Sequence, residues 1–354
     1  DSAFSNPALR LSVAKPVIAA EKSHTRFLRT CLSVASACED GTNLRYVPKN
    51  GFAILFGNDA WRQKRRRMNL DRKRAGDAFR EYTARYDVQD EKVRLKVEHT
   101  WRVAELCERI ARSLGMTKEE QELAWFAGLL HDVGRFEQLR RYGTFIDAQS
   151  IDHARYGAKI LFGKALTEQV LRQGQVHLRG QEEAGAKEAG SIRDYAADPQ
   201  EDVLLCTAVA WHSAYRIPEG LDERTARFCN ILRDADKIDI LKVNVDFPLE
   251  EIYNVSTQEL RSCQASPEVM DAFYEEHAVL RSLKRTAADH LIGHVSLVYE
   301  LVYPVSLRIV REQGYLEKML SFASDNPVTR EQFAAVRAHM GDWLAKNERR
   351  RNGD

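Results

Sequence analysis

Apolar residues recur at helical spacing along most of the chain after about residue 77, and no stretch alternates apolar and polar residues as a half-buried strand does. The first strong pattern covers residues 87–114 and places His99 on its apolar stripe. Gly115 is expected to end this helix. Thr117 and Glu120 then have the spacing of a capping box, which predicts the start of a second helix. The pattern therefore predicts an all-α fold.

The second predicted helix ends in an apolar run followed by His131 and Asp132, and Gly134 is expected to break it. Because the two helices are joined by a tight turn, His99 and His131 are expected to lie at the same end of an antiparallel pair. A carboxylate at the end of a buried helix is costly unless it is paired or holds a metal. The pattern therefore predicts a polar site at this end of the pair.

Further helices are expected along the rest of the chain. One covers residues 151–162 and carries His153, with Asp147 or Ser150 as its cap and with Gly157 allowing another helix to approach closely. Residues 178–200 are polar and are predicted to form a loop or a weak helix. The remaining predicted helices are 203–212 ending at His212, 222–243 containing Asp236, 267–284, 287–313 with a kink at Pro304, and 329–346.

Composition limits the class of protein. The chain has 354 residues, of which 44% are apolar and 30% charged, as in a globular protein. Its formal charge of +1 gives no strong field for a nucleic acid or a membrane surface, and no apolar run is long enough to cross a bilayer. The six cysteines show no zinc or redox spacing, so we expect a reducing, cytoplasmic compartment.

Residues 1–67 differ from the rest, because their apolar patches show no sustained period and they end in a basic run at residues 61–67. The run is interpreted as a solvated linker or, less favoured, as a contact for nucleic acid. A third hypothesis takes Met68 as the true start, with the preceding codons containing a ribosome-binding site. We expect a poorly structured or non-native extension over 1–67 and one functional unit over 68–354, with its motifs in about 77–243 and C-terminal helices in 244–348.

Six residues combine imidazole and carboxylate groups in the helical part of the chain: His99, His131, Asp132, His153, His212 and Asp236. Such groups bind divalent ions such as Mn²⁺, Fe²⁺, Co²⁺, Ni²⁺ and Zn²⁺. The absence of a thiolate from the set argues against a structural zinc site. Taken singly, each histidine is more often a hydrogen-bonded core residue than a ligand.

The order of these residues resembles that of the HD-domain metal-dependent phosphohydrolases. The matching segments are Val97-Glu98-His99-Thr100, Gly128 to Arg135, His153 to Ala158, Trp211-His212-Ser213 and Arg233 to Lys237. The resemblance implies an HD-domain helical bundle with additional C-terminal helices. It also implies one metal held by His99, His131, Asp132 and Asp236, and a second that Asp132 shares with His153 and His212. The implied reaction is hydrolysis of a phosphate ester by metal-activated water.

Two cations beside these residues are candidate catalytic groups together with Asp132. Arg135 follows His131-Asp132, and Lys237 follows Asp236, so either could neutralise charge on a phosphoryl group. The alternative for Arg135 is a salt bridge at the helix break, and for Lys237 a pairing with Asp234 or Asp239, which is slightly favoured. Weaker candidates are Arg140, Arg141 and Arg216. His290 and His294 have metal-chelating spacing but are interpreted as packing residues that could also line a pocket.

The leading hypothesis is therefore a metal-dependent phosphohydrolase acting on a small phosphorylated substrate, with a nucleotide favoured. It would use one or two divalent ions of the kinds named above, with Mg²⁺ also allowed. The alternative is a catalytically silent HD-fold module that regulates or binds nucleotides, although such a module has no need of all six residues. Neither a membrane nor a nucleic acid is expected as a partner, and a homo-oligomer is left open.

Overall fold

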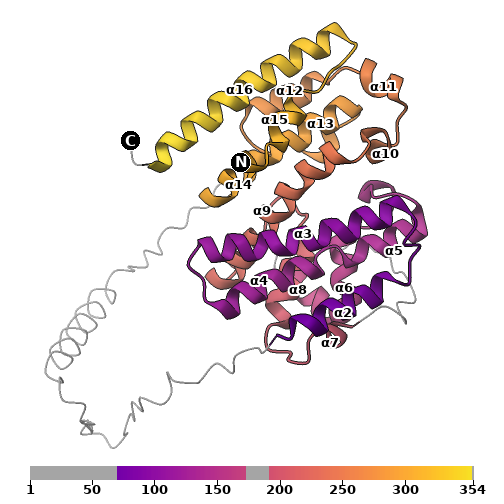
Figure 1. Cartoon of the computed structure of the whole chain (residues 1–354), viewed down its shortest axis with the longest axis vertical. Helices are drawn as coiled ribbons and strands as arrows, with labels where there is room; N and C mark the ends of the chain where they lie inside the picture. Colours follow the sequence, from indigo (N-terminus) through magenta and orange to yellow (C-terminus); the bar gives the residue numbers. More distant parts are fainter. Residues whose placement is uncertain (1–69, 173–190, 353–354) are drawn as a thin grey trace, which may run out of the picture. The chain divides into compact units, whose positions relative to one another are not determined.

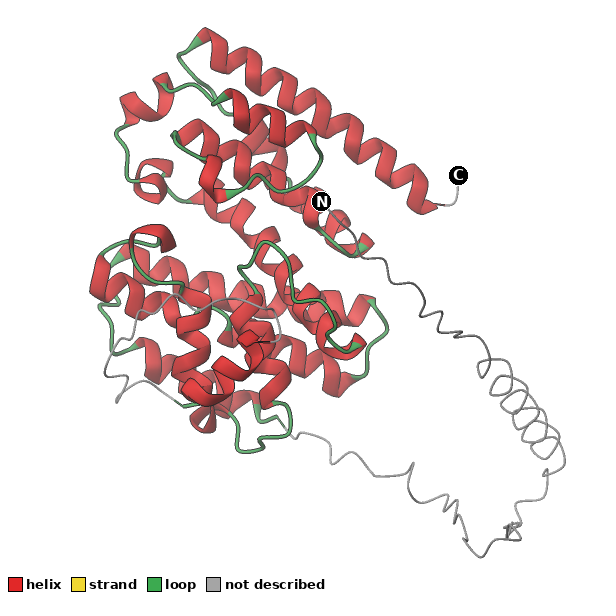
Figure 2. Cartoon of the chain, turned by 180° about the vertical axis from the view of Figure 1, so that it is seen from behind, coloured by secondary structure: helices red, strands yellow, loops and turns green. Residues whose placement is uncertain are grey.

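The computed structural model describes residues 70–172 and 191–352, and all the regular elements in these ranges are helices (Figure 2). The predicted all-α fold is thus confirmed for the part of the chain that the structure describes. The basic run, Met68 and the rest of the expected extension lie outside these ranges, as does most of the predicted loop at 178–200.

The first helical pair forms as the sequence predicts. Helices α3 (Glu91–Ser113) and α4 (Lys118–Leu130) pack along each other (Figure 1). Between them Gly115 has a φ of +69°, a left-handed conformation that ends α3 at little cost for glycine. The capping box is present, with the Thr117 hydroxyl accepting from the Glu120 N–H and the Glu120 carboxylate accepting from the Thr117 N–H.

The predicted break at Gly134 is wrong by a few residues. Helix α4 ends at Leu130, the His131-Asp132 dipeptide forms the corner, and α5 (Val133–Tyr142) begins before the glycine. Gly134 serves packing instead, because a Cβ there would overlap the His153 carbonyl oxygen and lie 2.7 Å from the Gly157 nitrogen. Gly157 thus allows the close helix approach that its position predicts.

Helix α6 (His153–Arg172) begins with the third histidine and extends beyond the predicted range, with a non-helical Gly163 inside it. Neither Asp147 nor Ser150 caps it, which corrects the prediction. The Asp152 carboxylate accepts from the Arg155 N–H at 3.1 Å and so occupies the capping position. Asp147 lies instead in a short 3-10 helix, η1 (Asp147–Gln149), where its carboxylate is free to face the site.

Four further helices complete the bundle that contains the six predicted site residues. Helix α8 (Asp202–Trp211) packs on α6, and α9 (Glu223–Asp246), capped by Asp222, packs on α3, α4 and α8. Helix α2 (Arg72–Thr83) packs on the short helix α7 (Ile192–Tyr195). Buried apolar side chains of α3, α4, α6, α8 and α9 make a continuous core below the site.

The C-terminal part has more and shorter helices than predicted. The two expected long helices are each interrupted, and the structure shows α10 (Leu249–Tyr253), α11 (Thr257–Ser262), α12 (Pro267–Tyr274), η2 (Arg281–Leu283), α13 (Ala287–Val295), η3 (Ser296–Glu300), α14 (Pro304–Gln313), α15 (Tyr315–Leu320) and α16 (Pro327–Asn352). Pro304 does not kink a helix but begins one, since proline fits the first helical position, where an N–H needs no partner. Figure 1 shows α9 connecting the bundle to these helices.

In the described ranges, the helices are too short or too polar to cross a membrane. Cys107, Cys206 and Cys229 are buried as free thiols, in line with their positions on apolar helical stripes.

Candidate metal centre

The predicted site residues converge from separate helices. His99 lies on α3, His131 and Asp132 at the corner after α4, His153 at the start of α6, His212 after α8, and Asp236 on α9. All four imidazoles and Asp132 are almost completely buried.

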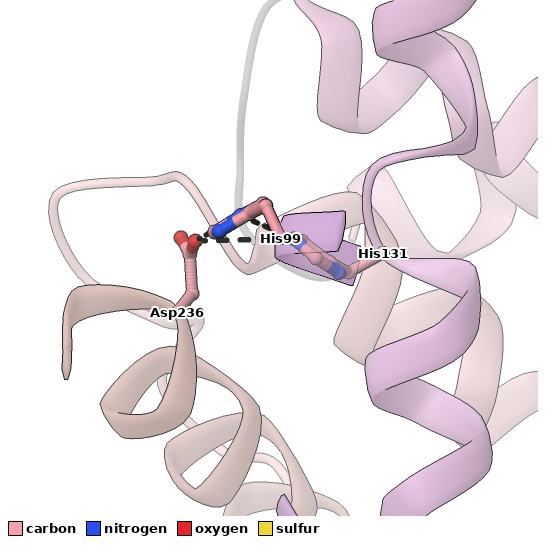
Figure 3. Close-up of side chains that lie close together, drawn as sticks. All are labelled: His99, His131 and Asp236. Atoms are coloured by element: carbon pink, nitrogen blue, oxygen red, sulfur yellow. Dashed lines mark hydrogen bonds and ion pairs between the residues drawn. The ribbon is translucent and has the colours of Figure 1, made fainter. Parts of the chain in front are cut away.

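The first group consists of His99, His131 and Asp236 (Figure 3). The two Nε2 atoms of the histidines are 3.3 Å apart. Asp236 Oδ1 lies 3.3 Å from His99 Nε2 and 3.8 Å from His131 Nε2. Three potential ligand atoms therefore point at one small volume.

The second group contains His153 and His212, and Asp132 lies between the two groups. His153 Nε2 and His212 Nε2 are 3.1 Å apart. Asp132 Oδ1 lies 3.5 Å from His153 Nε2 and 3.7 Å from His212 Nε2, while its Oδ2 lies 3.6 Å from His99 Nε2 and 3.5 Å from His131 Nε2. The Asp132 carboxylate thus bridges the two groups.

Backbone carbonyl groups orient two of the rings. His131 Nδ1 lies 2.7 Å from the Gly128 carbonyl oxygen, and His212 Nδ1 lies 2.8 Å from the Val209 carbonyl oxygen. Since a carbonyl oxygen only accepts, each of these Nδ1 atoms must carry the proton. The Nε2 atom of each ring then presents a lone pair to the site.

Carboxylates orient the other two rings. His99 Nδ1 lies 2.7 Å from Asp239 Oδ2, and His153 Nδ1 lies 2.9 Å from Asp147 Oδ1. In their neutral forms the rings therefore face each other in two pairs, His99 with His131 and His153 with His212, with the Nε2 lone pairs of each pair pointing together. This arrangement is unfavourable without a cation between the two nitrogen atoms. Nitrogen and oxygen ligands with outer hydrogen bonds of this kind fit a divalent metal ion.

The electrostatics favour ligand forms of most of these groups. Burial lowers the pKa of His131, and burial together with Arg135 lowers the pKa of His153 to about 4, so both rings are neutral near pH 7. Burial and Lys96 act to lower the pKa of His99, but hydrogen bonds to Asp236 and Asp239 outweigh them and raise it.

The two carboxylates of the site stay ionised. Burial alone would raise the pKa of Asp132, but Lys96 and His131 hold it well below its usual value. The pKa of Asp236 is likewise lowered, because its hydrogen bond to His99 and the nearby His131 outweigh burial.

Sequence reasoning missed three residues that contact the site. Lys96 Nζ lies 2.8 Å from Asp132 Oδ2, and Asp239 and Asp147 orient His99 and His153. Lys96 and Asp239 each lie three residues from a predicted ligand, a spacing that puts both on the ligand's face of the helix. Asp147 has no such signal, since it lies in the short helix η1 and not on the helix that carries His153.

Arg135 has several partners. Its Nη1 lies 2.9 Å from Asp147 Oδ1 and 2.6 Å from the Phe145 carbonyl oxygen, and its Nε lies 3.6 Å from Asp132 Oδ1. The salt-bridge alternative thus has a structural basis, and the same guanidinium lies within reach of the bridging carboxylate.

The expected pairing of Lys237 is wrong for the described residues, because the two proposed carboxylates have other partners. Asp234 accepts hydrogen bonds from the N–H groups of Val302 and Tyr303, while Asp239 accepts from Arg102. Burial and Arg233 lower the pKa of Lys237 to about 8, and its side chain lines the cavity over the metal centre.

The weaker candidates lie outside the ligand groups. Arg140 and Arg141 pair with Glu137, and Arg216 pairs with Glu300. His294 Nδ1 lies 3.0 Å from Asn244 Oδ1, and His290 stacks on Tyr253 with 5.3 Å between ring centroids. Both histidines therefore pack, and His294 also lines the cavity.

The cavity has a volume of about 480 Å³. Asp132, His153, His212 and Asp236 form one part of its wall. Residues that follow α12, among them Arg281 and Lys284, form another part. The C-terminal part of the chain therefore helps to enclose the site.

Comparison with known proteins agrees with this geometry. The family model of the HD domain matches residues 97–241. The chain is similar to the 3'3'-cGAMP-specific phosphodiesterase 1 of Vibrio cholerae serotype O1, with 29% identity over 90 residues, which are 23% of this chain and 21% of that protein. The chain thus spans about a fifth of the length of that relative, and no solved structure matches it. The matched residues include the whole converging His/Asp set, so residues 97–241 form an HD domain.

Proposed function

We propose that the protein is a metal-dependent phosphohydrolase that cleaves a phosphate ester of a nucleotide. The observation that carries this proposal is the pair of facing Nε2 groups on either side of Asp132, buried at the wall of a cavity. The cavity volume of about 480 Å³ is in the range of small-molecule sites.

The ligand assignment follows the two groups. His99, His131 and Asp236 would hold one ion, His153 and His212 would hold the other, and Asp132 would bridge them. Bound divalent ions would polarise the phosphoryl oxygens and supply hydroxide at neutral pH.

The surrounding side chains hold this arrangement in place. Lys96 stabilises the charge of Asp132, and Asp239 and Asp147 fix the rings of His99 and His153. Together with the carbonyl groups that orient His131 and His212, these contacts keep the four Nε2 atoms directed inward before substrate arrives, so little reorganisation is needed at the moment of reaction.

Two cations have different proposed roles. The Lys237 ammonium has no ion-pair partner among the described residues and lines the cavity beside Asp236, so we assign it to the charge of the phosphoryl group under attack. Arg135 is engaged by Asp147 and by the Phe145 carbonyl group, so we assign it mainly to positioning Asp147.

A nucleotide is proposed as substrate because the relative from Vibrio cholerae is named for a cyclic dinucleotide. The test is release of phosphate from nucleoside monophosphates and diphosphates, and ring opening of cyclic nucleotides to linear nucleotides followed by chromatography, with the full chain and Mn²⁺, Co²⁺, Ni²⁺ or Mg²⁺. Asp132→Ala should lose at least about 10²-fold in rate, because both metal groups lose their shared ligand.

Asp271→Ala is a matched control, since Asp271 is an exposed aspartate on α12, away from the cavity. It should leave the rate and the thermal stability unchanged. Equal rates for Asp132→Ala and wild type would reject the site assignment. Nucleotide binding without turnover in any metal would instead favour the regulatory module.

A further inference from the structure

The segment between α12 and α13 brings positive charge to the cavity from outside the HD domain. Leu280, Arg281, Ser282 and Lys284 of this segment line the cavity on the wall that follows the HD domain in sequence. Arg281 and Lys284 belong to the single turn η2 and the residue after it.

Lys284 is a partly buried cation that has no counterion in the described ranges. Its Nζ makes no hydrogen bond or ion pair with another residue in the ranges that the structure describes. The carboxylate with the strongest effect on it is that of Asp289, which accepts hydrogen bonds from Ser266 at 2.7 Å and from the N–H groups of Arg285 and Thr286. The oxygens of Asp289 are thus used to hold the start of α13, and Lys284 is left for another anion.

Helix α13 makes room for this lysine. A Cβ on Gly293 would overlap Cε and Nζ of Lys284, so the side chain lies directly across the glycine. Glycine inside a helix costs about 1 kcal/mol relative to alanine. The helix therefore carries a destabilising residue at the position that admits the ammonium group.

Neighbouring charges locate the lysine relative to the metal centre. Arg281 Nη1 lies 2.9 Å from Asp147 Oδ2, and the other oxygen of the same carboxylate holds His153. Burial lowers the pKa of His294, and the charges of Lys284 and Asp236 both act on that ring. The segment therefore reaches the cavity next to the ligand groups.

An unpaired ammonium group in a partly buried position is unfavourable for folding, and loss of hydration lowers the pKa of Lys284 to about 8. The group is still mostly charged near pH 7. A cation kept in this way at a cavity wall is best explained by an anion that enters the cavity.

We propose that Lys284, assisted by Arg281, forms a subsite that binds a second phosphate group of the substrate, one that is not attacked. This subsite rests on the proposed function in one respect only, namely that the molecule bound there is the substrate. It names the class of substrate as phosphate esters with at least two phosphate groups.

The direct test is binding of pyrophosphate to the full chain, measured by isothermal titration calorimetry with divalent ions removed by EDTA. Lys284→Met should weaken binding at least about tenfold, the loss expected for one charge-assisted contact. Gly293→Ala should also weaken it, because the new methyl group displaces the ammonium group while keeping its charge.

Arg285→Met is the matched control, since it removes the same charge from the adjacent, exposed residue. It should leave pyrophosphate binding unchanged. Lys284→Met should also raise the unfolding temperature, because a thioether replaces an unpartnered, partly buried cation. Unchanged binding in Lys284→Met, or an equal loss in Arg285→Met, would overturn the subsite.

A second measurement separates this inference from the proposed function. The kcat/KM ratio of a nucleoside diphosphate to the monophosphate should fall about tenfold in Lys284→Met, mainly through KM. An unchanged ratio would contradict the subsite. A wild-type protein that turns over neither substrate would contradict the proposed function, while the pyrophosphate titration would still decide on Lys284.

Discussion

Asp239 offers the sharpest test of how the metal centre is held, because it does not belong to the proposed ligand set. Its carboxylate is buried, with Oδ2 2.7 Å from His99 Nδ1. It also accepts from Arg102 Nε at 2.8 Å and from Arg102 Nη2 at 2.9 Å. Asp239→Ala removes all three contacts without touching a proposed ligand.

The expected loss of stability follows from these contacts. A hydrogen bond to a charged group contributes about 1.5 to 3 kcal/mol. The side chain of Arg102 is 26% exposed, so water can replace its lost partner in part. We therefore expect Asp239→Ala to lower the free energy of unfolding by about 2 to 3 kcal/mol.

The expected loss of metal affinity has a separate cause. Without an acceptor on Nδ1, the His99 ring is free to rotate and to take the other tautomer, so its Nε2 lone pair is no longer fixed. Loss of such an outer partner weakens metal binding by about 10- to 100-fold. Asp239→Asn should lose less, because an amide oxygen can still accept from His99.

The assay is a Mn²⁺ titration of the EDTA-treated full chain by calorimetry, together with urea unfolding without metal. Asp246→Ala is the matched control, since Asp246 lies on the same helix, is exposed and pairs with Lys242. Wild-type affinity for Mn²⁺ in Asp239→Ala would refute the assignment of Asp239 as the residue that orients His99.

Three further predictions follow from the same structure. Asp147→Ala should weaken Mn²⁺ binding about 10- to 100-fold at the group that contains His153, and an unchanged titration would contradict its role. Gly134→Ala should lower the free energy of unfolding in urea by about 3 kcal/mol, because its Cβ overlaps backbone of α6, whereas Gly341→Ala, with open space around it, should raise it by about 0.5 to 1 kcal/mol. Burial opposes ionisation of Glu108, but hydrogen bonds from two cations lower its pKa to about 2. The ionised carboxylate therefore stabilises the folded state fully above the unfolded pKa of about 4.3, and this stabilisation is lost as the pH falls through about 2. Glu108→Gln should remove about 2 kcal/mol of the acid-dependent loss in free energy of unfolding between pH 5 and pH 2.

The sequence predicted the parts of this protein that depend on local pattern. The capping box at Thr117 and the close approach at Gly157 both follow from short-range chemistry, and both are present. The convergence of His99 and His131 follows from the length of two helices and the tight turn between them.

The errors lie where packing of distant segments decides. Gly134 was expected to break a helix, but its small size serves contact with α6, which no local pattern shows. A kink was predicted at Pro304, but helix α14 begins there. The residues before it form the separate 3-10 helix η3, so no continuous helix runs through the proline. The contact of Asp147 with His153 could not be predicted, because it depends on how the short helix η1 folds against the start of α6.

The groups that surround Asp132 come from helices far apart in the chain, between residues 99 and 236. Ions bound there as proposed would cross-link these helices. A ligand that binds only the folded state stabilises it by about 2.7 kcal/mol at a concentration of 100 times its Kd. Metal supply would then govern the lifetime of the protein against proteolysis, so that cells short of the ion would contain less of the protein as well as less of its activity.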